Sequence, residues 1–490
     1  MNTGFRSQVV PEYRLLTDNQ IYEFHRTALE VNAKIGIRVR NEEGVELLRQ
    51  HGCTVTDTGN VLIPNDLVEE CLRSVPSRID IYNRKGEPAM RLEGRNIYFG
   101  TGTDLITSHD VYTGEMRPSV LQDVVNASRV ADACQNIDFV ASFALPHDVP
   151  TNVMYVECVK AMLQNTVKPI FTTAAGLEDL QVIVEMAETV MGGADELRTK
   201  PCIIHYSEPT PPLMHSCGAV RKLFFCADKG VPITYAPADV LGGSAPVTLA
   251  GGIVQALAEA QSGIVLHQLR RKGAPIISGF GTPAMDMRTS ICSYAAPELR
   301  PTNSACCDIF HWYGIPMWGT VGSDAFVFDQ QAGMEYAFAT LMAALDGANL
   351  IHDVGYLGQG LVGNPAMLVM CDEIISYVKR FMRGFDMGGK LMAIDVIRKV
   401  GANGSGSYLS EDHTRKYFKQ ELWQPSLMNR NDCASWNQKG CLTYGQKVIT
   451  RTIQILENHR PDVLTPEIDQ KLQEIAKRAE NELAALYFVA

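Results

Sequence analysis

The chain has 490 residues, of which 46% are hydrophobic and 20% are charged, and its formal net charge is −11. This length exceeds one ordinary domain and suits a barrel of roughly 250 residues with large additions. The acidic balance and the lack of a basic run argue against a nucleic-acid-binding protein. No apolar stretch of about 18 residues runs without a charge or a Gly/Pro interruption, so we expect no membrane span.

Thirteen cysteines occur, and none of them form a C-x-x-C motif. Most lie in apolar stretches, which is typical of reduced core residues in a cytosolic protein. The polar segment Met1–Arg14 has no apolar run behind a basic start, so we expect no signal peptide. These observations together predict a cytoplasmic protein.

The first ninety residues predict a mainly helical cap, residues 1–90. Thr17-Asp18 marks a helix start, and Ile21–Ala33 carries apolar residues at helical spacing. A second short helix is expected over Glu42–Gln50. A third is expected over Leu67–Val75, with Asn65 or Asp66 as its N-cap.

A regular alternation of short apolar runs and longer amphipathic segments follows. Eight runs are candidate strands: 97–100, 139–145, 169–174, 202–206, 232–236, 275–280, 317–321 and 350–354. Candidate helices lie between them: 120–133, 153–163, 177–191, 217–227, 249–269 and 331–345. Strands of this kind are buried on both faces, as in a parallel sheet. The pattern predicts a (β/α)₈ (TIM) barrel over residues 91–390.

The alternative architecture is an open, doubly wound parallel sheet. It would need a Gly-rich turn after its first strand, and Gly100-Thr101-Gly102 lacks the third glycine of that fingerprint. The barrel is therefore favoured. Residues 391–490 are expected to form a mainly helical extension, with a Gly/Ser loop over Gly401–Ser407 and a charged terminal helix over Pro466–Leu486.

Chemistry in a barrel gathers at the carboxyl ends of the strands, so the residues that end the eight runs are the candidates for a site. The candidate substrate-binding side chains are Tyr98, Tyr206, Tyr235, Phe280, His352 and Tyr356. Possible additional residues are His205, Glu208, Asp239 and Asp324. The strand ends contain no lysine, which argues against Schiff-base chemistry, and no residue is assigned as a catalytic acid, base or nucleophile.

Each candidate has a structural alternative. A tyrosine at a strand end can be simple packing, and His352-Asp353 can be a satisfied buried pair. His205 and Glu208 could offer two ligands to zinc, but a third ligand is not evident, so we expect no metal. The run Leu241–Thr248 precedes a long helix, and the amides of Gly243 and Ser244 could hold an anion or form only a tight turn.

Several long segments resemble one known family. The block from Trp318 to Gly355 reads WGTVGSDAFVFDQQAGMEYAFATLMAALDGANLIHDVG, and HTRKYFKQELWQPSL follows from His413. Upstream, YAPADVLGGSAPVTLAGGIVQALAEAQSGIVLHQL and YFGTGTD belong to the same pattern. In order and spacing these segments are similar to the trimethylamine methyltransferase superfamily. Its archetypes carry pyrrolysine, whereas this chain reads through with ordinary residues and so resembles the pyrrolysine-free branch.

That resemblance implies transfer of a methyl group from a quaternary amine, with glycine betaine favoured, to the Co(I) corrinoid of a partner protein. The corrinoid (cobalamin) would belong to that partner, and this chain would bind no metal. Proline betaine, carnitine and γ-butyrobetaine stay open as substrates. A homo-oligomer is expected. From another functional class, a non-catalytic betaine-binding protein is the alternative, and a radical or lyase enzyme with its own cofactor is a third reading.

Overall fold

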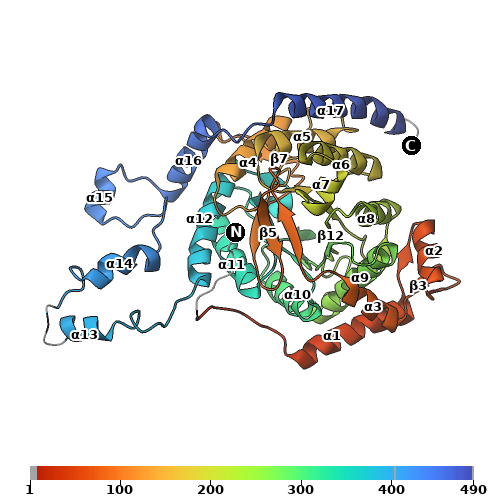
Figure 1. The fold of residues 1–490 in the computed structure, drawn as a ribbon, viewed down its shortest axis with the longest axis horizontal. Helices are drawn as coiled ribbons and strands as arrows, with labels where there is room; N and C mark the ends of the chain where they lie inside the picture. Colours follow the sequence, from red (N-terminus) through yellow and green to blue (C-terminus); the bar gives the residue numbers. More distant parts are fainter. Residues whose placement is uncertain (1–7, 402–403, 405, 488–490) are drawn as a thin grey trace.

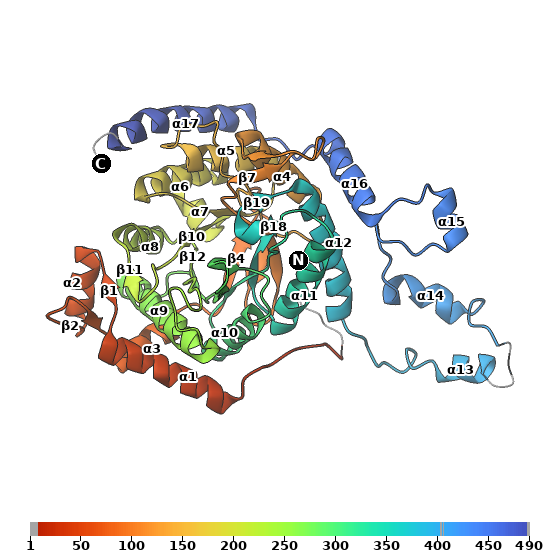
Figure 2. The same ribbon diagram turned by 180° about the vertical axis from the view of Figure 1, so that it is seen from behind.

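The fold is seen in a computed structural model that describes residues 8–401, 404 and 406–487, with side chains given up to residue 484 (Figure 1). Residues 1–7, within the segment Met1–Arg14, lie outside the described residues, as does part of the expected loop Gly401–Ser407. An α/β organisation is confirmed, with the sheet segments surrounded by helices in both views (Figures 1 and 2).

The N-terminal residues form a helical layer with short strands. Helix α1 (Asp18–Glu30) starts where Thr17 and Gln20 form a capping box, and a π-helical turn, η1 (Val31–Ile35), follows it. Helix α2 (Glu42–Gln50) is capped by Asn41, and α3 (Asn65–Ser74) follows. Pro64, not Asn65 or Asp66, occupies the N-cap of α3, because proline suits a helix start where no amide partner is needed. Helices α1, α2 and α3 pack on α9 (Leu249–Arg270).

All eight predicted runs contribute parallel strand pairings. The strands are β6 (Tyr98–Thr101), β9 (Ile170–Thr172), β10 (Ile203–Ser207), β12 (Ile233–Tyr235), β13 (Ile276–Ile277), β16 (Trp318–Thr320) and β17 (Leu350–Val354). Strands β9, β10, β12 and β13 pair in that order, as do β16, β17 and β6. Single parallel bridges join the rest: Gly100 to Phe139, Val140 to Ile170, and Ser278 to Met317. The series of pairings is therefore closed: it leads from β6 through the other strands and back to β6.

Side chains from all eight segments meet in one apolar cluster. Its members are Tyr98, Phe139, Ala141, Phe171, Ile204, Ala236, Ile277, Trp318 and Leu350, with Tyr206 against it. The same cluster includes residues of the antiparallel hairpin β4 (Ile79–Tyr82) and β5 (Pro88–Leu92). Strands on opposite sides of the ring can share a cluster only if these side chains point inward. The hairpin covers the amino end of the ring, because it contacts Tyr98 and Leu350, the first residues of their strands.

A larger apolar cluster lies between the ring and the helices outside it. These helices are α4 (Leu121–Ala133), α5 (Met154–Asn165), α6 (Leu177–Met191), α7 (Ala194–Thr199), α8 (Cys217–Lys229), α9, α10 (Leu299–Tyr313), α11 (Gln330–Asp346) and α12 (Pro365–Met382). Among the described residues, α9 alone has the length and apolar composition of a membrane span, and 72% of that window is buried inside the protein. Its burial is typical of a core helix, and its apolar run is interrupted by Glu259 and Gly263.

Short strands are grouped near the carboxyl ends of the ring. One sheet contains β7 (Thr107–His109), β8 (Met116–Pro118), β18 (Tyr356–Leu357) and β19 (Val362–Gly363). The 3₁₀ turn η2 (Gly358–Gly360) connects β18 to β19. Strands β14 (Ala284–Asp286) and β15 (Ile291–Ser293) form a hairpin. Two further pairs involve strands of the N-terminal layer: β1 (Arg38–Val39) with β11 (Met214–His215), and β2 (Thr54–Val55) with β3 (Val61–Leu62).

The C-terminal residues are mainly helical, as expected. Helix α16 (Tyr444–Asn458) packs on α12 and α4, and α17 (Pro466–Tyr487) packs on α5 and α6. Between α12 and α16 lie three short helices, α13 (Ile394–Val400), α14 (Asp412–Glu421) and α15 (Cys433–Gln438). Both views show these three extending sideways, away from the ring and its helices (Figures 1 and 2).

Candidate active site

His352 lies at the centre of five aromatic side chains. Its ring centroid is 4.5 Å from Phe171, 6.2 Å from Tyr206 and 6.3 Å from Tyr356. The rings of Trp318 and Phe139 complete the group at 6.4 and 6.5 Å. These residues come from segments on different sides of the ring of strands. We call the six residues the His352 cluster.

Strand alternation and two glycines bring the cluster together. Successive side chains of a strand point to opposite faces, so His352 shares its face with Leu350 in the ring interior. A Cβ atom on Gly100 would lie 2.1 Å from the ring of Phe139, and one on Gly102 would lie 1.9 Å from the ring of Tyr356. Glycine is therefore required at both positions for the aromatic rings to approach the backbone of β6.

One nitrogen of His352 is held and the other is free for a ligand. Nδ1 lies 2.8 Å from Oδ1 of Asp353, whose Oδ2 accepts a hydrogen bond from the Thr320 hydroxyl. Asp353 has a φ of 71°, a strained value for a residue other than glycine and one found often at functional sites. His352 is 3% exposed, and its Nε2 has no hydrogen-bond partner among the described residues. A buried polar atom of this kind needs a partner from outside the chain.

Two carboxyl groups lie near the cluster. The hydroxyl of Tyr206 donates to Oε2 of Glu208 at 2.7 Å, and the hydroxyls of Ser142 and Thr173 donate to Oδ1 of Asp104 at 3.3 and 3.1 Å. Desolvation raises the pKa of both carboxyls above the usual range, and the hydrogen bonds oppose this rise. Glu208 still has solvent-exposed surface, so solvent reaches this part of the site.

A lysine on helix α8 lies within electrostatic reach of these carboxyls. The Lys222 ammonium donates to the carbonyl of Ala174 at 2.9 Å, and its charge interacts with Glu208 and Asp104. Burial lowers the pKa of Lys222, and these carboxylates counteract that effect. The site thus combines aromatic rings, two carboxyls and one ammonium, a set that suits a ligand with a cationic group.

Two predicted cage residues lie away from the cluster. Tyr98 begins β6 at the amino end of the ring, where its hydroxyl accepts a hydrogen bond from the amide of Arg91 in the hairpin at 2.9 Å. Tyr235 points outward onto α9, where it stacks on His215 and bonds it through the hydroxyl at 2.9 Å. Tyr98 and Tyr235 both belong to the expected strands. Tyr98 lies at the amino end of the ring, and the Tyr235 side chain points out of the ring, so neither is part of the His352 cluster.

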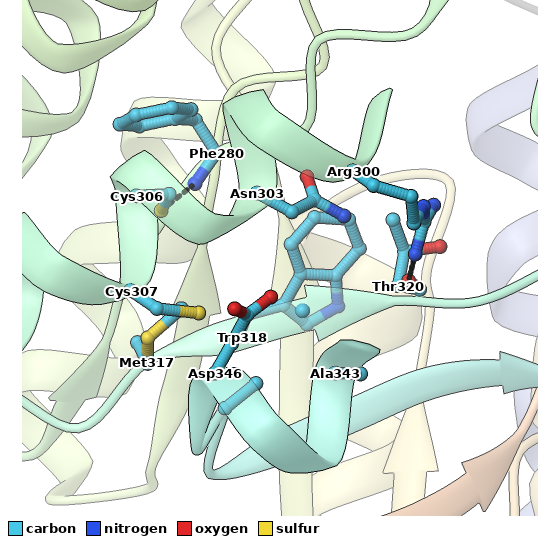
Figure 3. Close-up of a pocket in the computed structure, with 12 residues that line it drawn as sticks. Phe280, Arg300, Asn303, Cys306, Cys307, Met317, Trp318, Thr320, Ala343 and Asp346 are labelled. Carbon is cyan, nitrogen blue, oxygen red and sulfur yellow. Dashed lines mark hydrogen bonds between the residues drawn. The ribbon is translucent and has the colours of Figure 1, made fainter. Parts of the chain in front are cut away.

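Phe280 also packs outside the cluster. Its ring meets Phe310 of α10 edge-on at 6.4 Å, and its amide donates to Sγ of Cys306. Figure 3 shows this region, a small cavity between the ring and α10–α11, with the Phe280 ring directed away from Trp318. The cavity has a volume of about 10 Å³, which is room for about one water molecule and not for an amine substrate.

The expected anion site at Gly243 and Ser244 is occupied by the loop itself. The amides of Gly243 and Ser244 both donate to the carbonyl of Val240 at 2.9 Å, and the Gly242 amide donates to the carbonyl of Ala245 at 2.9 Å. The Ser244 hydroxyl accepts from the Val240 amide. The loop is therefore a self-contained turn, and its amides are not directed at a ligand.

His205 and Glu208 do not face one another. Ile204 and Tyr206 point into the ring, so His205 between them points outward, where Nδ1 lies 3.2 Å from the Thr172 hydroxyl. Burial lowers the pKa of His205 well below its usual value. Asp324 accepts hydrogen bonds from the Ser293 hydroxyl and, at 2.9 Å, from the Tyr294 amide, and so fixes the end of the β14–β15 hairpin.

Asp239 forms a buried carboxyl pair with Glu259 of α9. Gln255 donates to both, and Oδ2 of Asp239 and Oε2 of Glu259 have no partner among the described residues. Desolvation raises the pKa of Asp239 to about 7 and that of Glu259 to about 8. This pair lies beside the Val240–Ala245 turn and not in the His352 cluster.

The Asp239–Glu259 pair is expected to make the stability of the protein depend on pH. Between the ordinary carboxyl pKa values near 4 and pH 7–8, the folded protein holds protons that the unfolded chain has released, so stability falls as the pH rises through this window. Each proton contributes a slope of about 1.4 kcal/mol per pH unit. We expect Asp239→Asn to flatten the slope, measured by urea unfolding at pH 5, 6, 7 and 8. An unchanged slope would show that the pair is ionised throughout.

The sequence did not single out several residues that the structure places at the site. Phe139, Phe171 and Trp318 begin or lie within their runs, so a search of strand ends does not select them. Lys222 lies within a helix, and a search of strand ends cannot find it. Phe139, Phe171 and Trp318 share one signal: each is a large aromatic residue at an inward-facing position of its run.

Comparisons with known proteins agree on one family. The family model described as trimethylamine methyltransferase (MTTB) matches residues 3–484. The trimethylamine methyltransferase MttB of Desulfitobacterium hafniense strain DSM 10664 / DCB-2 is 31% identical over 95% of this chain and 94% of its own. The glycine betaine methyltransferase of D. hafniense strain Y51 is also 31% identical, over 95% of this chain and 97% of its own.

Solved structures add a likeness of fold. The monomethylamine methyltransferase MtmB of Methanosarcina barkeri has a TM-score of 0.53 and 10% identity, covering 92% of this chain and 89% of its own. The hydroxylamine complex of MtmB has a TM-score of 0.55 at 9% identity with the same coverage. From the match to the family model and the two relatives at 31% identity, the chain belongs to the trimethylamine methyltransferase family.

Proposed function

We propose that this protein transfers a methyl group from a quaternary amine, with glycine betaine favoured, to the Co(I) corrinoid of a partner protein. In this proposal the ring of strands acts as a (β/α)₈ barrel, with the reaction at its carboxyl ends. The observation that carries the proposal is the buried Nε2 of His352, which has no hydrogen-bond partner in the part of the chain that the structure describes and lies inside a group of five aromatic rings. The imidazole nitrogen could bind the anionic end of a ligand, and the aromatic faces around it could bind a cationic end.

The aromatic side chains would bind the trimethylammonium group. A fixed positive charge on methyl groups is attracted to aromatic faces by about 0.5–2 kcal/mol per contact. Phe171, Tyr206 and Trp318 offer such faces beside His352. The carboxyls of Glu208 and Asp104 add negative charge nearby when ionised, and this favours a cation further.

His352 would bind the carboxylate of the betaine. With the imidazole protonated on both nitrogens in the bound complex, Nδ1–H would donate to Asp353 and Nε2–H would donate to the carboxylate of the betaine. The alternative donors, the amides of Gly243 and Ser244, are taken by Val240. Lys222 supplies a second positive charge near Glu208 and Asp104. The Asp353 contact would orient the imidazole ring.

In the proposed reaction the main task of the protein is to position the substrate. The C–N bond of the substrate breaks, its electron pair stays on nitrogen, and a neutral tertiary amine leaves while the methyl group goes to Co(I). A neutral leaving group needs neither a proton nor a Lewis acid. The residues of the site would bind the cation, aim one methyl group outward and exclude water.

The methyl acceptor would be a second substrate carried by its own protein. A corrinoid is too large to enter the space within the ring, so the carrier would dock over the carboxyl ends of the strands. Proline betaine, carnitine and γ-butyrobetaine share the charged groups of glycine betaine and stay alternatives. A betaine-binding protein without activity is the alternative from another class, and a cytoplasmic location stays a prediction.

An assay with free cob(I)alamin tests the reaction without the carrier. We expect the purified protein to methylate cob(I)alamin with at least one carboxylated quaternary amine, followed by visible absorbance. Treatment with a strong chelator should leave the rate unchanged, because the leaving group needs no Lewis acid. Binding of betaine without methyl transfer would support the binding-protein alternative, and a rate lost on chelation and restored by zinc would contradict the proposed chemistry.

A further inference from the structure

The small cavity between the ring and helices α10 and α11 is lined by four buried residues that each have a polar atom without a partner (Figure 3). These atoms are Nη2 of Arg300, Oδ1 of Asn303, Nε1 of Trp318 and Oδ1 of Asp346, and none forms a hydrogen bond among the described residues. The four residues are only 3% to 9% exposed. A buried donor or acceptor without a partner destabilises the folded state, so four of them around one space indicate a shared partner.

The four atoms divide equally into donors and acceptors. The guanidinium N–H of Arg300 and the indole N–H of Trp318 can only donate. The carboxylate oxygen of Asp346 accepts, as does the amide oxygen of Asn303 in the orientation that the structure gives. A water molecule donates two hydrogen bonds and accepts two, so one water can satisfy all four atoms. A halide would leave both oxygens without a donor, and a metal cation would face two N–H groups.

We propose that one internal water molecule binds in this cavity, joins Arg300 to Asp346, and fixes the orientation of the Trp318 indole in the His352 cluster. The cavity volume of about 10 Å³ is that of about one water molecule. Both charged side chains line the cavity, yet neither forms an ion pair with another described residue. A bridging water would carry their interaction across the space between them. Arg300 and Asp346 would then be positioning residues for the proposed function, on which this part of the inference rests.

Burial disfavours the charged forms of both residues. Desolvation lowers the pKa of Arg300 to about 10, although the charge of Asp346 opposes this change. Desolvation also raises the pKa of Asp346 to about 7, although a hydrogen bond with Ser304 and the charge of Arg300 oppose the rise. A water molecule hydrogen-bonded to both groups would stabilise both charged forms, because buried ions need their remaining hydrogen bonds satisfied.

Two connections lead from the cavity to the His352 cluster. The first is Trp318, because its indole nitrogen is one of the four cavity atoms and its ring centroid lies 6.4 Å from that of His352. The second is Arg300, whose Nη1 donates to the carbonyl of Thr320 at 3.1 Å, as the dashed line in Figure 3 shows. The Thr320 hydroxyl in turn donates to Asp353, the partner of His352. The water would therefore hold two neighbouring parts of the site in place.

A crystal structure of the unmodified protein, grown with bromide in place of chloride, tests the water directly. We expect one density peak within hydrogen-bond distance of all four atoms, without an anomalous signal from bromine. A bromide ion at this position, a cavity without density, or a direct contact between Arg300 and Asp346 that closes the cavity would each overturn the proposal. This measurement does not depend on the proposed reaction, so the two can fail separately.

Substitutions at Asp346 test the connection to the site. Asp346→Leu puts apolar atoms in place of one acceptor, whereas Asp346→Asn keeps an oxygen there. We expect Asp346→Leu to raise the KM for glycine betaine about tenfold with a smaller change in kcat, because the Trp318 ring loses its fixed orientation toward the cation. Asp346→Asn should restore most of this loss. Glu373→Leu in α12 is the matched control: Glu373 is also 3% exposed, but it accepts from the backbone amides of Ser426 and Leu427, so we expect an unchanged KM.

Tryptophan fluorescence shows whether the Trp318 indole itself responds. The chain has four tryptophans, so replacing Trp312, Trp423 and Trp436 with phenylalanine leaves Trp318 as the one reporter. In this background we expect Asp346→Leu to shift the emission to the blue, because the indole N–H loses its hydrogen bond, and Asp346→Asn and Glu373→Leu to leave it in place. An emission that Asp346→Leu does not change, or equal effects of Asp346→Leu and Glu373→Leu, would overturn the positioning role.

Discussion

Replacing His352 with phenylalanine is expected to raise the KM for glycine betaine by roughly 100-fold, or about 2.7 kcal/mol, in methyl transfer to cob(I)alamin. Phenylalanine keeps an aromatic ring among Phe171, Tyr206 and Trp318 and removes only the two nitrogens. The buried Nε2, which has no partner among the described residues, is the donor that the betaine carboxylate would use.

A cation without a carboxylate is the matched control for this variant. Tetramethylammonium offers the same methyl groups and charge, so His352→Phe should change its KM by less than about threefold, because the aromatic contacts remain. An equal loss for both substrates would mean that His352 acts on the cation or on the fold. No loss for either would remove His352 from the site.

Replacing Gly102 with alanine is expected to abolish activity and to destabilise the protein by about 3 kcal/mol or more. A Cβ atom there would lie 1.9 Å from the ring of Tyr356, which has no room to retreat because its hydroxyl bonds the backbone of Thr103 on both sides. The Tyr356 ring would have to leave the His352 cluster or the strand would have to move. Urea unfolding and the methyl-transfer rate measure the two effects.

Gly218→Ala serves as the control for this substitution. A Cβ on Gly218, near the start of α8, has no atom within 4 Å among the described residues, and alanine favours a helix over glycine by about 1 kcal/mol. We therefore expect unchanged activity and equal or greater stability. If Gly102→Ala were as stable and active as Gly218→Ala, the close approach of Tyr356 to β6 would not exist in solution.

The order of strands and helices could be predicted because each run is buried on both faces and each helix has its own periodicity. The runs at 97–100, 202–206 and 350–354 all became strands of the ring. The hairpin β4–β5 could not be predicted as a cover for the amino end, because its residues contact the ring only through the tertiary fold. Helices α13–α15 were expected only as part of a helical extension, because helices of 6 to 10 residues are marginal without packing and leave a weak periodic pattern.

The site was harder to predict, because a strand end is known from sequence only to within a few residues. A shift of one residue moves a side chain to the other face. This error placed Tyr235 in the cage, although it packs on α9, and made His205 a neighbour of Glu208. Three predicted residues, His352, Tyr206 and Tyr356, lie together in the structure, because each is at an inward position close to the carboxyl end.

The rate of cob(I)alamin methylation from glycine betaine, compared with that from trimethylamine under the same conditions, tests the central claim most directly. Trimethylamine is mostly protonated in neutral water, and its free base would have to expel an amide anion, whereas a quaternary amine carries its activation in its fixed charge. We predict a measurable rate with glycine betaine and none above background with trimethylamine. Equal rates with both amines, or no rate with any quaternary amine, would contradict the account.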